Sequence, residues 1–437
     1  MRKVATPRFQ VEGAGRSVLQ RRMSATTIVA GVGVVVTALR WELTLNVTLG
    51  TVMALALAPV WFPRLIRYRG ALLISLVAIA CLPVGAWLTA VSSDERSTSD
   101  RLLVGTSILL LNVILGTGML LWARTRMSGA SVAILYGVGL LLAVPGSGRL
   151  SEDPWRFGFS VPLTVLLLAI AWRSGRRWLE IVTALLLAAV TAASGGRSLF
   201  AILALAAILS SWQVPPRILN VGVSRVRTLA FLAAALAALY TLGQSLTLEG
   251  YLGQSAQERT QQQVSTAGSV LAGGRPEMGA TFALVGHEPL GFGAGARLNA
   301  TDLLVAKSGM ADLGYDPNNR YVETYMFGAG IELHSYLADL WSDFGVVGVV
   351  LGALIVWQIA RHLSGALAHR AASALIVYVG VQTAWNLFFS PRYGSIPLLV
   401  LTLGLMIPLR DTSYVEPDTE ETGSVAASEA EGRLYSE

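Results

Sequence analysis

Hydrophobic residues along the chain fall in long blocks that short polar connections separate. A helix needs roughly 20 apolar residues to cross the hydrocarbon core of a bilayer. The blocks therefore predict an all-α polytopic membrane protein with about twelve transmembrane helices. The predicted spans are 24–40, 44–62, 71–91, 102–122, 129–146, 157–172, 179–195, 198–213, 228–246, 338–360, 371–389 and 394–409.

Basic residues gather in every second connection between the blocks, and this sets the direction of the helices. Lys and Arg mark the cytoplasmic side of a membrane protein. The N-terminal segment 1–23 is basic, and an even number of spans returns the chain to the same side, so both termini are predicted to be cytoplasmic. The later cytoplasmic connections contain Arg64, Arg67, Arg69, Arg124, Arg126, Arg173, Arg176, Arg177, Arg217, Arg225, Arg227, Arg361 and Arg370.

The same rule decides how residues 179–213 cross the membrane. They are almost continuously apolar, but the connections on both sides are basic and therefore lie on one side. The number of crossings between them must be even. We therefore expect the chain to turn at Gly195-Gly196, which places Arg197 at the outer boundary of the membrane.

One connection is much longer than the others. Residues 24–246 hold the first nine predicted helices, residues 247–337 form a large extracytoplasmic loop, and residues 338–409 hold the last three helices. Within the loop, Gln254–Gln263 is polar, and we expect it to be a helix or a flexible arm. The acidic segment 410–437 is expected to be a disordered cytoplasmic tail. Loops of this length are uncommon unless they are functional, so the site is predicted in residues 247–337.

Composition supports a membrane protein and excludes other classes. Hydrophobic residues make up 53% of the chain and charged residues 14%, well below the charged share of an ordinary soluble enzyme. The net charge of +6 is scattered between apolar blocks instead of lining one face, so no nucleic-acid partner is expected. The single cysteine, Cys81, permits no disulfide within the chain. We find no cluster with ligand spacing, and therefore expect no metal and no cofactor.

Of the four histidines, His334 is the one that we consider for chemistry. It lies where the long loop re-enters the membrane, and it either satisfies a helix end or acts as a general base near neutral pH. His287 lies in a turn sequence, and we expect a structural role. His362 and His369 are expected to be solvated, or to face phospholipid, in an arginine-rich cytoplasmic loop.

Two arginines are predicted on the outer side. Arg197 either extends to the lipid headgroups or binds an anion together with the free N–H groups of a helix start. Arg275 precedes Pro276, where a helix can begin, and is either solvated or part of an anion site. The outer-side acids are either solvated or orient a sugar, and they are Asp94, Glu95, Asp316 and Glu323.

Three segments together resemble the O-antigen ligase and O-antigen polymerase superfamily of bacterial envelope glycosyltransferases. Ala193–Ser198 is similar to the family's small-residue turn with an arginine between two membrane helices. Gly274–Gly293 is similar to its arginine-led helix followed by a Pro-Leu-x-Gly-x-Gly turn, and His334–Gly348 to its His-Asn-Ser-Tyr-Leu…Gly-x-x-Gly pattern. The chain departs from the family at Ser335, where Asn is common, and at Met278-Gly279, where an aromatic residue is frequent. The resemblance covers about residues 20–410.

The resemblance implies a metal-independent, inverting transfer of a glycan in the biosynthesis of envelope polysaccharide. The donor is a glycan on a polyprenyl (undecaprenyl) pyrophosphate carrier, and the acceptor is a hydroxyl of a glycan or lipid at the outer face of the bacterial plasma (inner) membrane. Arg197 and Arg275 would bind the pyrophosphate, because a planar guanidinium pairs with phosphate through two hydrogen bonds. His334 would take the proton from the acceptor hydroxyl.

Several readings remain open at this point. The same residues serve a ligase, which attaches a finished glycan to another acceptor, and a polymerase, which joins repeat units. A protein O-oligosaccharyltransferase is a third variant. From another class, a transporter or flippase would explain the spans, but it predicts charged or broken helices at mid-membrane. A non-catalytic sensor or scaffold is the remaining alternative.

Overall fold

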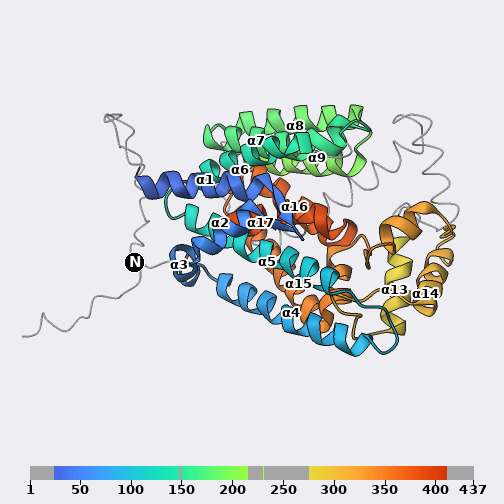
Figure 1. Ribbon diagram of the computed structural model, residues 1–437. Helices are drawn as coiled ribbons and strands as arrows, with labels where there is room; N and C mark the ends of the chain where they lie inside the picture. The colour runs from blue at the N-terminus through green and yellow to red at the C-terminus, as the bar shows by residue number, and fades with distance from the viewer. Residues whose placement is uncertain (1–23, 147–149, 215–229, 231–274, 411–437) are drawn as a thin grey trace, which may run out of the picture.

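The computed structural model describes residues 24–146, 150–214, 230 and 275–410, and these residues are mostly helical (Figure 1). In this part, five helices are long and apolar enough to cross a membrane. They are α4 (Ala71–Ser92), α5 (Asp100–Ala123), α6 (Gly129–Ala143) with the turn η2 (Val144–Gly146), η3 (Trp155–Phe159) with α7 (Ser160–Arg173), and α15 (Tyr336–Ala368). The membrane character predicted from the hydrophobic blocks is confirmed at this level, and the count of twelve crossings stays a prediction.

The remaining predicted spans also coincide with helices, although shorter ones. These are α1 (Ala25–Leu39), α8 (Arg177–Ala193), α9 (Arg197–Trp212), α16 (Ala374–Phe389) and α17 (Arg392–Met406). Hydroxyl side chains define several starts, since Ser24, Ser99 and Ser373 each accept a hydrogen bond from the backbone three residues later. The predicted span 228–246 lies outside the described residues apart from Ala230.

The predicted single helix over 44–62 is wrong. The structure has a small antiparallel hairpin there, β1 (Glu42–Thr44) and β2 (Val47–Thr48), so the chain is not purely α-helical. Two helices follow, α2 (Leu49–Ala56) and α3 (Ala58–Trp61) with η1 (Phe62–Arg67), and they are bent by 58°. Pro59 lacks an N–H, and its ring crowds the carbonyl four residues earlier, which favours a bend at this point.

The helices pack in an order that places α16 near the centre. Successive pairs from α6 to α9 lie on one side of the molecule, with α1 against α6, while α4, α5 and α15 lie on the other (Figure 1). Helix α16 contacts α7, α8 and α9 from the first group and α15 and α17 from the second. One large apolar core connects both groups. Residues at the end of α16 can therefore contact elements from both groups of helices.

The described part of the long loop forms a small helical unit at one end of the molecule (Figure 1). It contains α13 (Glu277–His287), α14 (Ala300–Ala311) and the π-helical turn η4 (Tyr321–Met326). Helices α13 and α14 cross closely at Gly279 and Gly309, where an added Cβ would collide with the opposite backbone. A separate apolar core holds the unit together and includes Trp341 of α15. The unit is thus packed onto the first turns of α15.

Candidate active site

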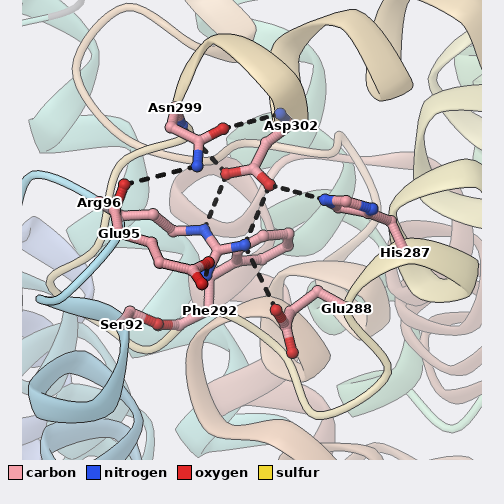
Figure 2. A network of polar contacts seen from close by, with 8 residues as sticks. All are labelled: Ser92, Glu95, Arg96, His287, Glu288, Phe292, Asn299 and Asp302. Carbon is pink, nitrogen blue, oxygen red and sulfur yellow. Dashed lines mark hydrogen bonds and ion pairs between the residues drawn. The ribbon is translucent and has the colours of Figure 1, made fainter.

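A buried ionic network attaches the helical unit to the end of α4 (Figure 2). The guanidinium of Arg96 donates from Nε and Nη2 to both oxygens of Asp302, at 2.8 and 3.0 Å, and from Nη2 to Glu288 at 3.3 Å. His287 Nε2 lies 3.2 Å from Asp302 Oδ1. Asp302 also closes a capping box with Asn299 at the start of α14. The network fixes where α13 and α14 stand relative to the bundle.

The charges in this network stabilise each other. Burial raises the pKa of Asp302, but the hydrogen bonds from Arg96 and Asn299 and the charge of Arg96 outweigh it, and the pKa lies below its usual value. The hydrogen bond to Asp302 raises the pKa of Arg96. His287 is the last residue of α13 and contacts Asp302 in this network, and its structural role stays a prediction. Neither Arg96 nor Asp302 lies in a sequence motif that predicts this network.

The Pro-Leu-Gly-Phe-Gly turn follows the network and lies against α15. Gly291 and Gly293 have φ of 87° and 101°, a conformation that only glycine adopts readily. It allows the N–H groups of Phe292 and Gly293 to donate to the carbonyl of Ser342, at 2.8 and 2.9 Å. The turn therefore fixes the helical unit of α13, α14 and η4 against α15, the helix that begins next to His334.

His334 lies in a tight turn just before α15. Its φ is 51°, in the left-handed region that a residue with a side chain adopts at a cost. On one side the N–H of Leu333 donates to Asp339 Oδ1 at 2.8 Å, and on the other the hydroxyl of Ser335 donates to the carbonyl of Leu387 at 3.0 Å. Nδ1 of His334 is buried and has no hydrogen-bond partner among the described residues.

Arg275 reaches the same end of α16. Its Nη1 donates to the carbonyl of Phe389 at 2.9 Å, and its guanidinium carbon lies 5.6 Å from the ring centroids of both Trp385 and Phe389. The C-terminal end of a helix carries partial negative charge, which favours a cation there. Helix α13 begins at Glu277, directly after Arg275-Pro276. The predicted helix start after Arg275 is therefore confirmed.

Tyr321 connects Arg275 to His334. Its ring centroid lies 5.2 Å from that of His334, at an interplanar angle of 59°. Its hydroxyl donates to Oε1 of Glu277, two residues after Arg275. Burial and the negative charge of Glu277 raise the pKa of Tyr321, although Arg275 opposes this, so the hydroxyl remains a donor. The other oxygen of Glu277 is buried and has no partner within the described ranges. We call Arg275, Glu277, Tyr321 and His334 the Arg275–His334 cluster.

Arg197 lies at the same end of the bundle but contributes none of the contacts that build this cluster. Helix α8 ends at Ala193 and α9 begins at Arg197, with Gly195 between them at a φ of 70°, so the predicted turn is confirmed. At the other end of α9, Gln213 accepts a hydrogen bond of 2.9 Å from the N–H of Ala372, just before α16. Helices α9 and α16 are thus antiparallel, and the exposed Arg197 stands on the side where α16 ends at Phe389.

Other predicted residues lie elsewhere. The expected cytoplasmic loop around His362 is wrong, because α15 continues to Ala368 and His362 is a half-buried residue of that helix. His369 is exposed, as expected, and its Nδ1 lies 2.8 Å from the carbonyl of Gly365. The outer acids are also exposed, and Glu323 pairs with Lys307 at 3.3 Å. Among the described residues, none of the four outer acids forms a hydrogen bond or an ion pair with His334.

Comparisons with known proteins identify no relative. No protein-family model, no curated protein and no solved structure matches this chain. Among residues 24–146, 150–214, 230 and 275–410, no group of three or more His, Cys, Asp or Glu side chains is arranged to hold a metal ion. The chemistry of the site must therefore be argued from the Arg275–His334 cluster itself.

Proposed function

We propose that this chain is a membrane glycosyltransferase that moves a glycan from a polyprenyl pyrophosphate carrier to an acceptor hydroxyl at the outer face of the membrane. The observation that carries the proposal is the Arg275–His334 cluster. The guanidinium of Arg275, a cation suited to phosphate, donates to the carbonyl of Phe389 at the end of α16. The hydroxyl of Ser335, next to the imidazole of His334, donates to Leu387 at the same helix end, although Arg275 and His334 stand 59 positions apart in the sequence. The resemblance to O-antigen ligases assigns these same two residues.

Leaving-group stabilisation is the role that we assign to arginine. As the bond between the anomeric carbon and the phosphate oxygen breaks, negative charge develops on the pyrophosphate, and preorganised cations lower the energy of that state. A guanidinium has five N–H donors, so the contact of Arg275 with Phe389 leaves donors for phosphate. Arg197 stands at the same end of the bundle and, in our proposal, contacts the pyrophosphate from the α9 side.

Proton removal is the role that we assign to His334. The acceptor oxygen forms the new bond to the anomeric carbon from the face opposite the leaving pyrophosphate, and its proton passes to the imidazole. Nδ1 is buried, so Nε2 is the nitrogen that we assign to the acceptor. A single displacement of this kind inverts the configuration at the anomeric carbon. The ring of Tyr321, which lies tilted against the imidazole, limits the movement of that ring.

The test of the base is glycan transfer in proteoliposomes, with an undecaprenyl pyrophosphate glycan as donor and candidate acceptors supplied. His334→Ala is expected to lower kcat by about 10²- to 10⁴-fold, the usual contribution of a general base. His369→Ala is the matched control, because His369 is exposed at the other end of α15, and it should keep wild-type activity. Full activity of His334→Ala would refute the assignment of the base.

The same assay tests the arginines. Arg275→Ala should reduce kcat by about 10²- to 10³-fold, the loss typical of removing one transition-state donor. Arg297→Ala removes an exposed arginine of the same unit and should have little effect. Activity is measured with and without EDTA, and we expect no difference. A ladder of products would indicate a polymerase, and a single addition a ligase.

A further inference from the structure

Asp339 is a buried carboxylate that binds the backbone on both sides of the site. It lies in the first turn of α15 and its relative exposure is 0%. Oδ1 accepts from the N–H of Leu333 at 2.8 Å, and Oδ2 accepts from the N–H of Arg392 at 3.1 Å. One carboxylate therefore connects the residue before His334 to the first residue of α17.

The first of these bonds acts directly on His334. A residue with a Cβ keeps a positive φ only where its surroundings impose it. The bond from Leu333 to Asp339 fixes the chain on one side of His334, and the bond from Ser335 to Leu387 fixes it on the other. Without Asp339, the N–H of Leu333 loses its acceptor, and the nearest remaining hydrogen bond before His334 is the one from the N–H of Glu332 to the carbonyl of Met326.

We propose that Asp339 is the positioning residue for His334, which sets the direction of the imidazole for proton transfer. This inference rests on the proposed function, since it assumes that His334 acts as the base. Asp339 itself does not touch the reacting atoms. It acts through the backbone of Leu333, and misplacing a catalytic group by about 1 Å is enough to lower a rate about 100-fold.

A second buried acid, Asp343, provides a matched comparison. It lies one turn further along α15, is 4% exposed, and forms an ion pair with the side chain of Arg392. Its interactions are thus with the start of α17 and not with the turn at His334. Loss of Asp343 removes a buried charge partner without removing the acceptor of Leu333.

The experiment compares Asp339→Ala, Asp339→Asn and Asp343→Ala in the proteoliposome assay, with Tm measured for each. We expect Asp339→Ala to lower kcat about 100-fold while KM changes less than about 3-fold. Asp339→Asn keeps one acceptor oxygen, and its kcat should be about 10-fold higher than that of Asp339→Ala. Asp343→Ala should lower Tm at least as much as Asp339→Ala but keep kcat within about 3-fold of wild type. Equal losses of kcat in the two alanine variants would overturn the proposal.

A second measurement does not depend on catalysis. Diethyl pyrocarbonate carbethoxylates accessible imidazole nitrogens, and peptide mass spectrometry reads the rate at each histidine separately. Asp339→Ala should change the rate at His334 at least about 3-fold, because the turn that buries Nδ1 is released, and leave His287 unchanged. An unchanged rate at His334 would refute the positioning role even if His334→Ala is inactive. A changed rate together with an active His334→Ala would instead refute the proposed function.

Discussion

At the scale of single residues, Tyr321 is the side chain on which the cluster depends. It contacts His334 through its ring and Glu277 through its hydroxyl, so it connects the base to the helix that follows Arg275. Its partner Glu277 is buried, and Oε1 is the only one of its carboxylate oxygens with a side-chain donor among the described residues. A buried acceptor that loses its donor is costly, which makes the hydroxyl more important than its size suggests.

Tyr321→Phe tests this dependence. The variant keeps the ring beside His334 but leaves both oxygens of Glu277 without a side-chain donor, and we expect a loss of about 1–3 kcal/mol in the free energy of unfolding. Thermal unfolding in detergent measures it as a lower Tm. Tyr325→Phe is the control, since Tyr325 belongs to the same turn η4 but is 62% exposed. Equal Tm values for the two variants would mean that the Tyr321 hydroxyl contributes nothing.

At the scale of helices and turns, an ion pair between the residues after α4 and the start of α14 attaches the helical unit to the bundle, in addition to its apolar contacts with α15. Arg96 and Asp302 are separated by 206 residues in the sequence and are both buried. Breaking a buried ion pair from one side leaves an uncompensated charge, at a cost of about 3–5 kcal/mol. The capping box of Asp302 with Asn299 means that the same carboxylate also stabilises the first turn of α14.

Asp302→Asn should therefore loosen α13 and α14 selectively. At pH 7 we expect faster amide hydrogen exchange in these two helices, while α5 is unchanged. The folded pKa of Asp302 is depressed, so its stabilisation is present above the unfolded value of about 3.9 and is lost as the pH falls through the folded value. The difference in the hydrogen-exchange rates of α13 and α14 between wild type and Asp302→Asn should thus shrink below about pH 4. Asp312 is an exposed acid just after α14 and serves as the control. In Asp312→Asn, the amide hydrogen exchange of α13 and α14 should equal that of the wild type.

The sequence predicted the helices well because the signals for them are local. Apolar block length and the Gly195-Gly196 turn set boundaries that the structure reproduces within a few residues, as at α5 and α9. The hairpin at Glu42–Thr48 and the bend before Pro59 were missed, since the apolar composition continues through them. Arg275 and His334 were identified as candidates, and the cluster around them was not. Tyr321 has no signal near it in the sequence, and Asp339 lies in the segment His334–Gly348 without being marked as a candidate. The importance of both comes from partners that only the fold brings close.

At the scale of the whole molecule, the basic connections at Arg69 and Arg124 and the Arg275–His334 cluster lie at opposite ends of the described bundle. The N–H of Arg69 donates to Pro408 and the guanidinium of Arg124 to Ile407, both just after α17 ends. Arg392, where α17 begins, instead binds Asp339 beside the cluster. The basic residues that are predicted to mark the cytoplasmic side therefore stand a full helix length away from His334. This separation is what the proposed outward-facing site requires.

Side-specific labelling of single cysteines tests this orientation. In a Cys81→Ser background, Thr301→Cys places an exposed thiol on α14, and Ser174→Cys places one in the basic connection after α7. A membrane-impermeant maleimide applied to intact cells should modify Thr301→Cys, because the helical unit is predicted to be extracytoplasmic. Ser174→Cys should react only after the membrane is permeabilised. The reverse pattern would place His334 in the cytoplasm, where the proposed acceptor is not found, and both the orientation and the proposed function would then fail together.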